Sequence, residues 1–330
     1  MRSFYLTMFL LLGTMCSLSA QQLPQYSLYM FNQHQTNPAY AGLDNAIVLN
    51  GLVRKQWSGL EGSPLGQHVS AHMPLYILGG GVGFNAENDI AGALRRTSAT
   101  LSYNYWMKLS RKSLLSIGLG AGISQVSLDG RKLRAPGGIY SDPDNGGSIN
   151  HNDNQLPIGL ESAIAPIINA GLFFQSERFD IGASVKNILE SEVTYDLPNG
   201  TTSLTENRHF YGFAAAHFDI GKIFEWMPSL MVQSDLQQIQ AELSTLFRYN
   251  GNIFGGAGIR GYNNNTLDAV VLIAGFNLNE RTTLAYAYDL TLSTLNTVSN
   301  GSHEITIRYN LNKSVGGGVP PPVIFNPRFL

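Results

Sequence analysis

Few residues of this chain have the types and spacing that catalysis or metal binding requires. Its seven histidines form no HExxH pair, and His68 and His72, which would share one face of a strand, have no carboxylate nearby in sequence. The stretch from Leu128 to Pro157 carries Asp and Asn among glycines but lacks the order of an EF-hand loop, so solvated turns and a bound cation both stay open. No serine lies in a GxSxG motif. We therefore expect no catalytic residue, no cofactor and no metal site, and a protein that is not an enzyme.

The first twenty residues have the layout of a secretory signal peptide. Arg2 gives a positive start, Phe4 to Leu12 form an apolar core, and Ser17 to Ala20 form a small-residue end. A membrane anchor is the alternative, but the apolar core is short for one. Cleavage after residue 20 also removes Cys16, the only cysteine, so the mature chain can form no disulfide.

The composition is typical of an outer-membrane β-barrel. Only 13% of the residues are charged, whereas soluble domains carry roughly 25%. The net charge of −2 excludes a polybasic nucleic-acid-binding protein, and the 44% apolar share excludes a disordered chain. Beyond residue 20 the longest apolar run is Ala269 to Phe276, which is too short for a membrane helix. Short apolar segments in a chain with little charge favour membrane-spanning strands.

Apolar and polar residues alternate along many segments, which predicts strands with two different faces. From Thr97 to Leu109, for example, Leu101 and Tyr103 alternate with Ser102 and Asn104. We expect an all-β fold, an antiparallel transmembrane β-barrel of about fourteen strands; twelve or sixteen strands, or a soluble β-sandwich or jelly roll, are the alternatives. The predicted strands are residues 45–57, 66–74, 79–87, 97–109, 113–127, 166–176, 179–188, 207–220, 228–236, 239–249, 252–262, 267–278, 281–291 and 301–312.

Connection lengths orient this predicted barrel. Bacterial barrels have short turns at the periplasmic end and long loops outside the cell. Apart from residues 220–267, short connections follow even-numbered strands, so both termini are predicted to be periplasmic and loops 128–157 and 189–206 extracellular. The domain order is then a signal peptide at 1–20, a periplasmic segment at 21–44, the barrel at 45–312 and a Gly/Pro-rich tail at 313–330. We expect Leu119 to face lipid and Gly120 the lumen, with lipid-facing aromatics at Tyr103, Tyr105, Phe174, Tyr286 and Tyr309.

Three sequence blocks carry a family resemblance. The first block consists of Pro24 to Asn32 and Asn37-Pro38-Ala39-Tyr40-Ala41-Gly42. The second consists of Arg54-Lys55-Gln56-Trp57 and Gly62-Ser63-Pro64. The third consists of Tyr286-Ala287-Tyr288-Asp289 and Gly301 to Ile305. In their order and their places near both ends of the mature chain, they resemble the PorP/SprF family of Bacteroidetes outer-membrane proteins. That family belongs to the type IX secretion and gliding-motility system.

The resemblance implies an outer-membrane protein that helps export or anchor a secreted surface protein by protein–protein binding. Its implied partners are a secreted type IX client or surface adhesin, a periplasmic lipoprotein or peptidoglycan-linked component of the system, and outer-membrane lipid, but not nucleic acid. A porin or a hydrophobic-substrate channel is the alternative function. The identity of the client and whether the lumen is plugged stay open.

Partner contacts are predicted in one long loop and in the tail. The loop candidates are charged: Arg131, Lys132, Arg134, Asp142 and Asp144. The tail candidates are apolar and follow a stiff Pro320-Pro321-Pro322 spacer: Phe325, Phe329 and Leu330. The residues that match the family motif are Asn37, Pro38, Trp57, Asp289, Ser302, His303 and Glu304. Partner contact is one interpretation of the motif residues. The other is structural: a turn at Asn37-Pro38, an interfacial aromatic at Trp57, and a contact between His303 and a carboxylate that closes the barrel.

Overall fold

A computed structural model describes the protein at residues 24–141, 148–197, 200–261 and 267–311. The predicted signal peptide at 1–20 and the predicted tail at 313–330 lie outside the described residues. Within the described ranges, no helix is long and apolar enough to cross a membrane.

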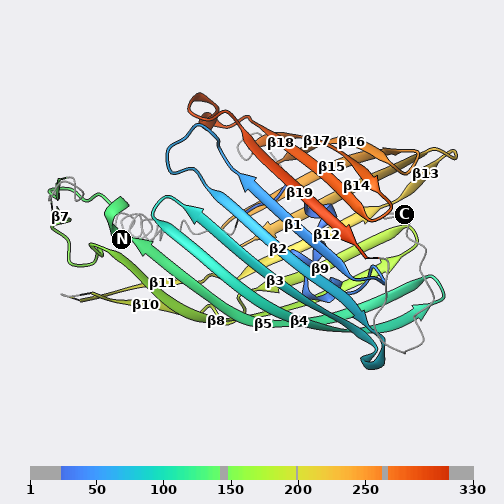
Figure 1. The fold of residues 1–330 in the computed structure, drawn as a ribbon, viewed down its shortest axis with the longest axis horizontal. Helices are drawn as coiled ribbons and strands as arrows, with labels where there is room; N and C mark the ends of the chain where they lie inside the picture. The colour runs from blue at the N-terminus through green and yellow to red at the C-terminus, as the bar shows by residue number, and fades with distance from the viewer. Residues whose placement is uncertain (1–23, 142–147, 198–199, 262–266, 312–330) are drawn as a thin grey trace, which may run out of the picture.

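Fourteen antiparallel strands close into a barrel (Figure 1), which confirms the predicted fold class. The main sheet contains one further short strand, β13 (Phe218–Ile220), which extends the line of β12 alongside β14 and adds nothing to the circumference. The barrel closes where β1 pairs with β19, with Val48 opposite Asn310 and Lys55 opposite His303. The strands of the wall are β1 (Val48–Lys55), β2 (Leu65–Leu75), β3 (Gly80–Ala91), β4 (Leu94–Ser110), β5 (Ser113–Asp129), β8 (Leu160–Ser176), β9 (Phe179–Lys186), β12 (His209–Ala216), β14 (Phe224–Ser234), β15 (Ile239–Tyr249), β16 (Ile253–Arg260), β17 (Ala269–Asn279), β18 (Thr282–Thr291) and β19 (Ser302–Asn310).

Side chains alternate between the two faces of the wall, because successive residues of a strand point to opposite sides. On β5, Leu119 is 63% exposed on the outer face, whereas Gly120 faces the interior. The aromatic side chains predicted to face lipid also lie on the outer face: Tyr103, Tyr105, Phe174, Tyr286 and Tyr309. An apolar outer face around a polar interior is the pattern that a lipid environment imposes on a barrel.

The two ends of the barrel differ in their connections. At the short-turn end, strands are joined by residues 111–112, 177–178, 221–223, 250–252 and 280–281, and β1 begins and β19 ends there. At the long-loop end, β5 and β8 are joined by residues 130–159 and β9 and β12 by residues 187–208.

Two predicted connections were wrong. The third and fourth strands are joined by a two-residue turn at 92–93, because β3 runs on to Ala91 and β4 begins at Leu94. Residues 85–89 are mostly polar, so the apolar pattern does not extend to the end of β3. The backbone pairing of β3 with β2 and β4 nevertheless continues through them. After the eighth strand, β13 and an early start of β14 leave only residues 221–223.

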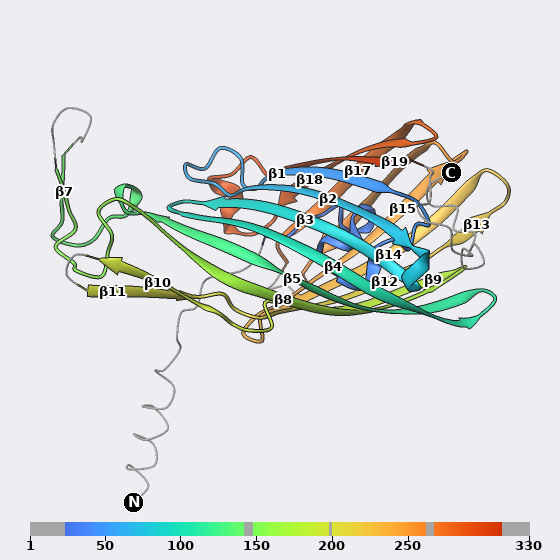
Figure 2. The same cartoon turned by 60° about the horizontal axis from the view of Figure 1, so that its bottom comes forward.

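One side of the barrel rises beyond the rest at the long-loop end (Figure 2). Strands β4, β5 and β8 have 17 residues each, whereas about 9–11 suffice to cross a membrane. A hairpin of β10 (Glu192–Leu197) and β11 (Gly200–Thr205) packs on this raised wall, with Val193 and Tyr195 against Val126 and Ala165. The 3₁₀ turn η5 (Gly130–Lys132) and the short pair β6 (Ile139–Tyr140) and β7 (Ile149–Asn150) also belong to this end.

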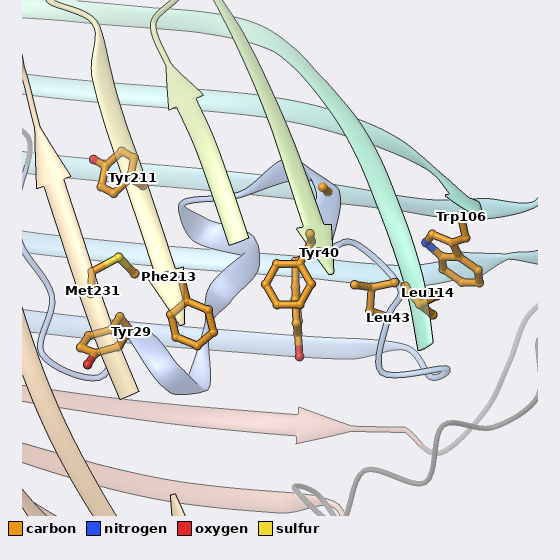
Figure 3. Packing of buried hydrophobic residues seen from close by; sticks show 10 residues of the cluster. Tyr29, Tyr40, Leu43, Trp106, Leu114, Tyr211, Phe213 and Met231 are labelled. Carbon is orange, nitrogen blue, oxygen red and sulfur yellow. The ribbon is translucent and has the colours of Figure 1, made fainter. Parts of the chain in front are cut away.

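Residues 24–46 lie inside the barrel, and we call this segment the plug. It contains three 3₁₀ turns, η1 (Tyr29–Phe31), η2 (Gln33–Gln35) and η3 (Pro38–Tyr40), and most of its side chains are buried. Figure 3 shows Tyr29 and Tyr40 of the plug among wall residues such as Phe213 and Met231. The sequence predicts a periplasmic segment at 21–44, whereas residues 24–44 lie in the lumen. The reason is that the wall supplies partners for both the apolar and the polar side chains of the plug.

Candidate functional site

A buried network of charges ties the start of the plug to the wall. Two guanidinium groups lie among three carboxylates: Arg54 bonds Asp289 at 2.6 Å and Glu304 at 2.9 Å, and Arg260 bonds Asp289 at 2.6 Å and Glu242 at 2.7 Å. These charged side chains are at most 5% exposed. We call these five residues and Ser27 of the plug the lumen cluster. Buried charges are tolerated only when they are paired and hydrogen-bonded, and here they come from β1, β15, β16, β18 and β19.

Glu304 is the residue of the lumen cluster that holds the plug backbone. Its carboxylate accepts the backbone N–H groups of Ser27 at 2.8 Å and Leu28 at 2.9 Å. The Ser27 hydroxyl donates to Asp289 Oδ1 at 2.8 Å. Because Arg54 and Glu304 are also opposite each other in the β1–β19 ladder, one ion pair closes the barrel and seats the plug.

A second contact anchors the other end of the plug. Asp44 Oδ1 lies 2.9 Å from Arg308 Nη2 of β19, and the Tyr40 hydroxyl donates to the same oxygen at 3.1 Å. His72 Nε2 of β2 lies 3.4 Å from Asp44 Oδ2. Burial alone would raise the pKa of Asp44, but Arg308 and His72 hold this pKa below its ordinary value. The plug is therefore attached to the wall at both of its ends.

The Asn37-Pro38 motif forms the predicted turn, and this turn lies inside the barrel. The Asn37 side chain accepts the Ala39 N–H at 2.9 Å and donates to the Leu172 carbonyl of β8 at 2.9 Å. The Ala39 carbonyl accepts hydrogen bonds from Asn104 and Ser116, each at 2.6 Å. The backbones come so close here that a Cβ at Gly118 would lie 2.4 Å from the Ala39 nitrogen.

Three buried histidines, His34 of the plug and His68 and His72 of β2, take part in hydrogen bonds between plug and wall. His34 Nε2 lies 2.8 Å from Ser102 Oγ, and His68 Nδ1 lies 3.0 Å from Asn32 Nδ2. Burial, together with the neighbouring His72 and His68, holds the pKa of His34 well below its ordinary value, so its ring is neutral at pH 7. In the part of the chain that the structure describes, no group of three or more His, Cys, Asp or Glu residues is arranged to hold a metal ion.

The motif residues of β18 and β19 divide between the two faces of the wall. Asp289, Ser302 and Glu304 face the lumen, while His303 faces outward with its Nδ1 2.6 Å from the Tyr286 hydroxyl. The carboxylate contact that closes the barrel is therefore made by Glu304 to Arg54, and not by His303 as the sequence suggested. Trp57 follows β1 in a left-handed backbone conformation, and its N–H donates to Ser302 Oγ at 3.1 Å.

A cavity of about 560 Å³, which we call the vestibule, lies at the long-loop end beside the start of the plug. Pro24 and Gln25 of the plug and three members of the lumen cluster, Arg54, Arg260 and Asp289, line one part of it. The rest of its lining comes from the long-loop ends of the strands and includes Trp57, Asp89, Arg96, Gln238, Gln240 and Asp268. Its volume is in the range of about 300–1,000 Å³ found for ligand sites.

The basic residues predicted for partner contact lie near η5, at the base of loop 130–159. Arg131 bonds Asp129 at 2.8 Å, Lys132 is exposed, and the Arg134 guanidinium lies 4.5 Å from the centroid of the Tyr140 ring. The other predicted contacts, Asp142, Asp144, Phe325, Phe329 and Leu330, lie outside the described residues.

Sequence reasoning missed several residues that hold the plug, namely Ser27, Asp44, Glu242, Arg260 and Arg308. A usable signal was present for the strand residues. In a chain with 13% charge, one or two Arg and Glu side chains stand at inward positions of β15, β16 and β19, among residues that carry no charge. Such charges need partners inside the barrel, although the pattern does not say which ones.

A closed barrel with an apolar outer face and a polar, filled interior defines a class of protein, the bacterial outer-membrane β-barrels. The model of one family, described as "Type IX secretion system membrane protein PorP/SprF", matches residues 18–309. The chain therefore belongs to the PorP/SprF family, as the sequence motifs predicted. It is an outer-membrane barrel of the type IX secretion system, and its family points to other components of that system as partners.

Several solved barrels are similar in overall structure. The toluene transporter TbuX of Ralstonia pickettii has a TM-score of 0.49 and 12% identity, over 83% of this chain and 91% of that chain. A FadL homologue of Pseudomonas aeruginosa has a TM-score of 0.45 and 11% identity, over 88% and 95% of the two chains. A comparison with curated proteins gives no match.

Proposed function

We propose that this barrel is a docking platform of the type IX system, which anchors or helps export a secreted surface protein through protein–protein contacts and has no enzymatic activity. The observation that carries the proposal is the occupied lumen. The plug fills the interior and is bonded to the wall through the lumen cluster at one end and through Asp44 and Arg308 at the other. A barrel whose interior is occupied in this way offers binding surfaces rather than a passage.

We place the client contact at the long-loop end, where the raised wall supports the longest connections. Loops on a rigid scaffold commonly carry recognition, and the packed β10–β11 hairpin gives this side such a scaffold. The proposed contact residues are Arg131, Lys132, Arg134, Asp142 and Asp144. Because short turns face the periplasm in bacterial barrels, the long-loop end would face outside, and Phe325, Phe329 and Leu330 would be available to a periplasmic lipoprotein or peptidoglycan-linked component.

The direct test is the isolation of native complexes from outer membranes. Deletion of residues 137–150 removes β6 and β7, whose paired ends are Ile139 and Asn150. This variant should still form a heat-modifiable barrel but should no longer retain the client. Deletion of residues 294–297, the η7 turn (Thr294–Thr297) of another long-loop connection, is the matched control and should leave retention unchanged. Full client retention by the 137–150 deletion would contradict the proposed contact.

Two further measurements bear on other parts of the proposal. Truncation after Asn312 should leave the barrel assembled and release the periplasmic component. In planar bilayers the wild-type barrel should show no stable conductance, since the plug fills its lumen; large stable conductance steps would instead favour a channel.

A further inference from the structure

The outward face of the neighbouring strands β1–β4 carries two exposed cations toward the long-loop end (Figure 1). Lys55 is the last residue of β1, and Arg95 is the second residue of β4. The pairing register places them in one row of the sheet, with Leu65 of β2 and Ile90 of β3 between them. Neighbouring strands are about 4.8 Å apart, so the two backbone positions are separated by about 14 Å.

No carboxylate among the described residues pairs with either cation. The acidic residues of β1–β4 are Glu87 and Asp89, and both are on the inward side, where Glu87 contacts the plug and Asp89 lines the vestibule. Lys55 donates to the Ser63 carbonyl at 3.0 Å, which holds its ammonium group but leaves the charge unpaired. A surface with charge of one sign attracts groups of the opposite sign, so this face favours an anion.

A network of polar side chains orients Arg95. Its Nε donates to Asn88 Oδ1 at 2.8 Å, and the Thr97 hydroxyl donates to the same oxygen at 3.0 Å. The Asn88 amide in turn donates to Gln67 Oε1 at 2.9 Å. Within the described residues, the two terminal nitrogens of Arg95 form no hydrogen bond. They present the planar fork of N–H donors that matches a phosphate group.

The outward face is apolar on the side of this row that lies toward the short-turn end. Val69, Phe84 and Leu101 are exposed there on β2, β3 and β4. On β18, the exposed Tyr286 lies one outward position from the row, opposite Ile305 of β19. Tyrosines are enriched at the interface between membrane and water. The two cations and the polar network therefore lie at the depth of lipid headgroups, with an apolar surface for acyl chains beside them.

We propose that this surface binds a lipid of the outer leaflet with a phosphorylated disaccharide headgroup. We call the surface the β1–β4 patch and define it by Lys55, Gln67, Asn88, Arg95 and Thr97. The two cations bind phosphate, the amide and hydroxyl groups contact the sugars, and the acyl chains cover the apolar positions. Cations about 14 Å apart suit a headgroup with a phosphate at each end, whereas a glycerophospholipid carries one phosphate. The outer leaflet is assigned from the proposed function, in which the long-loop end faces outside.

The test measures lipid binding to the purified full-length barrel in detergent micelles by native mass spectrometry. The three added lipids are diphosphoryl lipid A, dephosphorylated lipid A and phosphatidylglycerol. Diphosphoryl lipid A should bind about tenfold more tightly than the dephosphorylated form, and more tightly than phosphatidylglycerol. Equal binding of diphosphoryl lipid A and phosphatidylglycerol would overturn the proposal, because any lipid phosphate would then be sufficient.

Matched variants locate the binding site. The double variant Lys55→Gln/Arg95→Gln changes two exposed side chains and should weaken binding of diphosphoryl lipid A about tenfold. The control Arg111→Gln/Lys222→Gln removes an exposed Arg and an exposed Lys from turns at the opposite end and should leave binding unchanged. If the double variant binds as tightly as wild type, or if the control weakens binding equally, the β1–β4 patch is not the site and the proposal is wrong.

The leaflet is tested on intact cells. Glu61 is exposed in the connection that follows β1, at the same end of the barrel as the β1–β4 patch. A Glu61→Cys variant should react with a membrane-impermeant maleimide added outside the cell. Reaction only after the cells are broken would place the patch at the inner leaflet and overturn the assignment.

The outcomes for the lipid site and for the docking function are separable. If native complexes retain the client but the purified barrel does not prefer diphosphoryl lipid A, docking stands and the lipid site fails. If the wild-type barrel retains no client, while the lipid preference is present and is lost in Lys55→Gln/Arg95→Gln, the docking function fails and the lipid site stands.

Discussion

Replacement of Arg54 by Met removes one of the two cations of the lumen cluster while keeping a side chain of similar length. Arg54 is 2% exposed and bonds Asp289, Glu304 and the Ser27 hydroxyl. In the variant, Arg260 alone faces three buried carboxylates. Removal of one partner from a buried ion pair costs about 3–5 kcal/mol, so we expect the free energy of unfolding to fall by about that amount.

The matched control removes a cation from an exposed pair. Lys112 bonds Glu177 at 2.8 Å, but its side chain is 71% exposed, so Lys112→Met should cost at most about 1 kcal/mol. Urea unfolding in detergent micelles, followed by tryptophan fluorescence and gel mobility, measures both variants. The double variant Arg54→Met/Glu304→Gln should recover part of the loss, because it returns the lumen cluster to its original net charge. If Arg54→Met costs no more than Lys112→Met, the lumen cluster does not stabilise the seam and the plug, and the reasoning is refuted.

Three further predictions concern the direction in which wall side chains point, the packing between plug and wall, and the titration of His34. Leu119→Arg places a charge on the lipid face and should destabilise the barrel by about 2–4 kcal/mol, whereas Gln125→Arg, on the same face nearer the long-loop end, should change its stability little. Gly118→Ala should cost about 1–3 kcal/mol, because the new Cβ would lie 2.4 Å from the plug backbone, while Gly120→Ala, whose Cβ would meet its nearest atom at 3.6 Å, should be tolerated; equal urea midpoints would contradict this. His34 is buried with its pKa well below its ordinary value of 6.5, so the unfolded chain takes up the proton first. The free energy of unfolding should therefore fall as the pH drops below about 6.5, and a His34→Gln variant whose free energy of unfolding falls as steeply as that of the wild type would count against this assignment.

The plug shows where sequence reasoning reached its limit. The turn at Asn37-Pro38 was predicted correctly as local structure, because proline and asparagine bias the backbone wherever they stand. Its location was not predictable in the same way. The Asn37 side chain bonds a carbonyl 135 positions away, and no local pattern carries that information.

The raised wall and the β3–β4 turn illustrate a second limit. The apolar alternation is interrupted by polar residues toward the long-loop ends of β3 and β8. The ends of β3 and β8 were therefore missed, at Asn88 to Ala91 and at Leu160 to Ala165, although their backbone ladders are unbroken.

The sequence by itself determined the class of the fold, the number of strands, the faces of residues such as Leu119 and Gly120, and the family. The reason is that contact with lipid favours an apolar side chain at each outward position independently. The outer face therefore produces an alternation of apolar and polar residues that is visible within each strand segment. Only the tertiary structure decided the filled lumen, the lumen cluster and the vestibule. Their parts meet across the closed barrel, as Arg54 does with Asp289 at a separation of 235 positions, and such pairing depends on closure of the wall rather than on any local pattern.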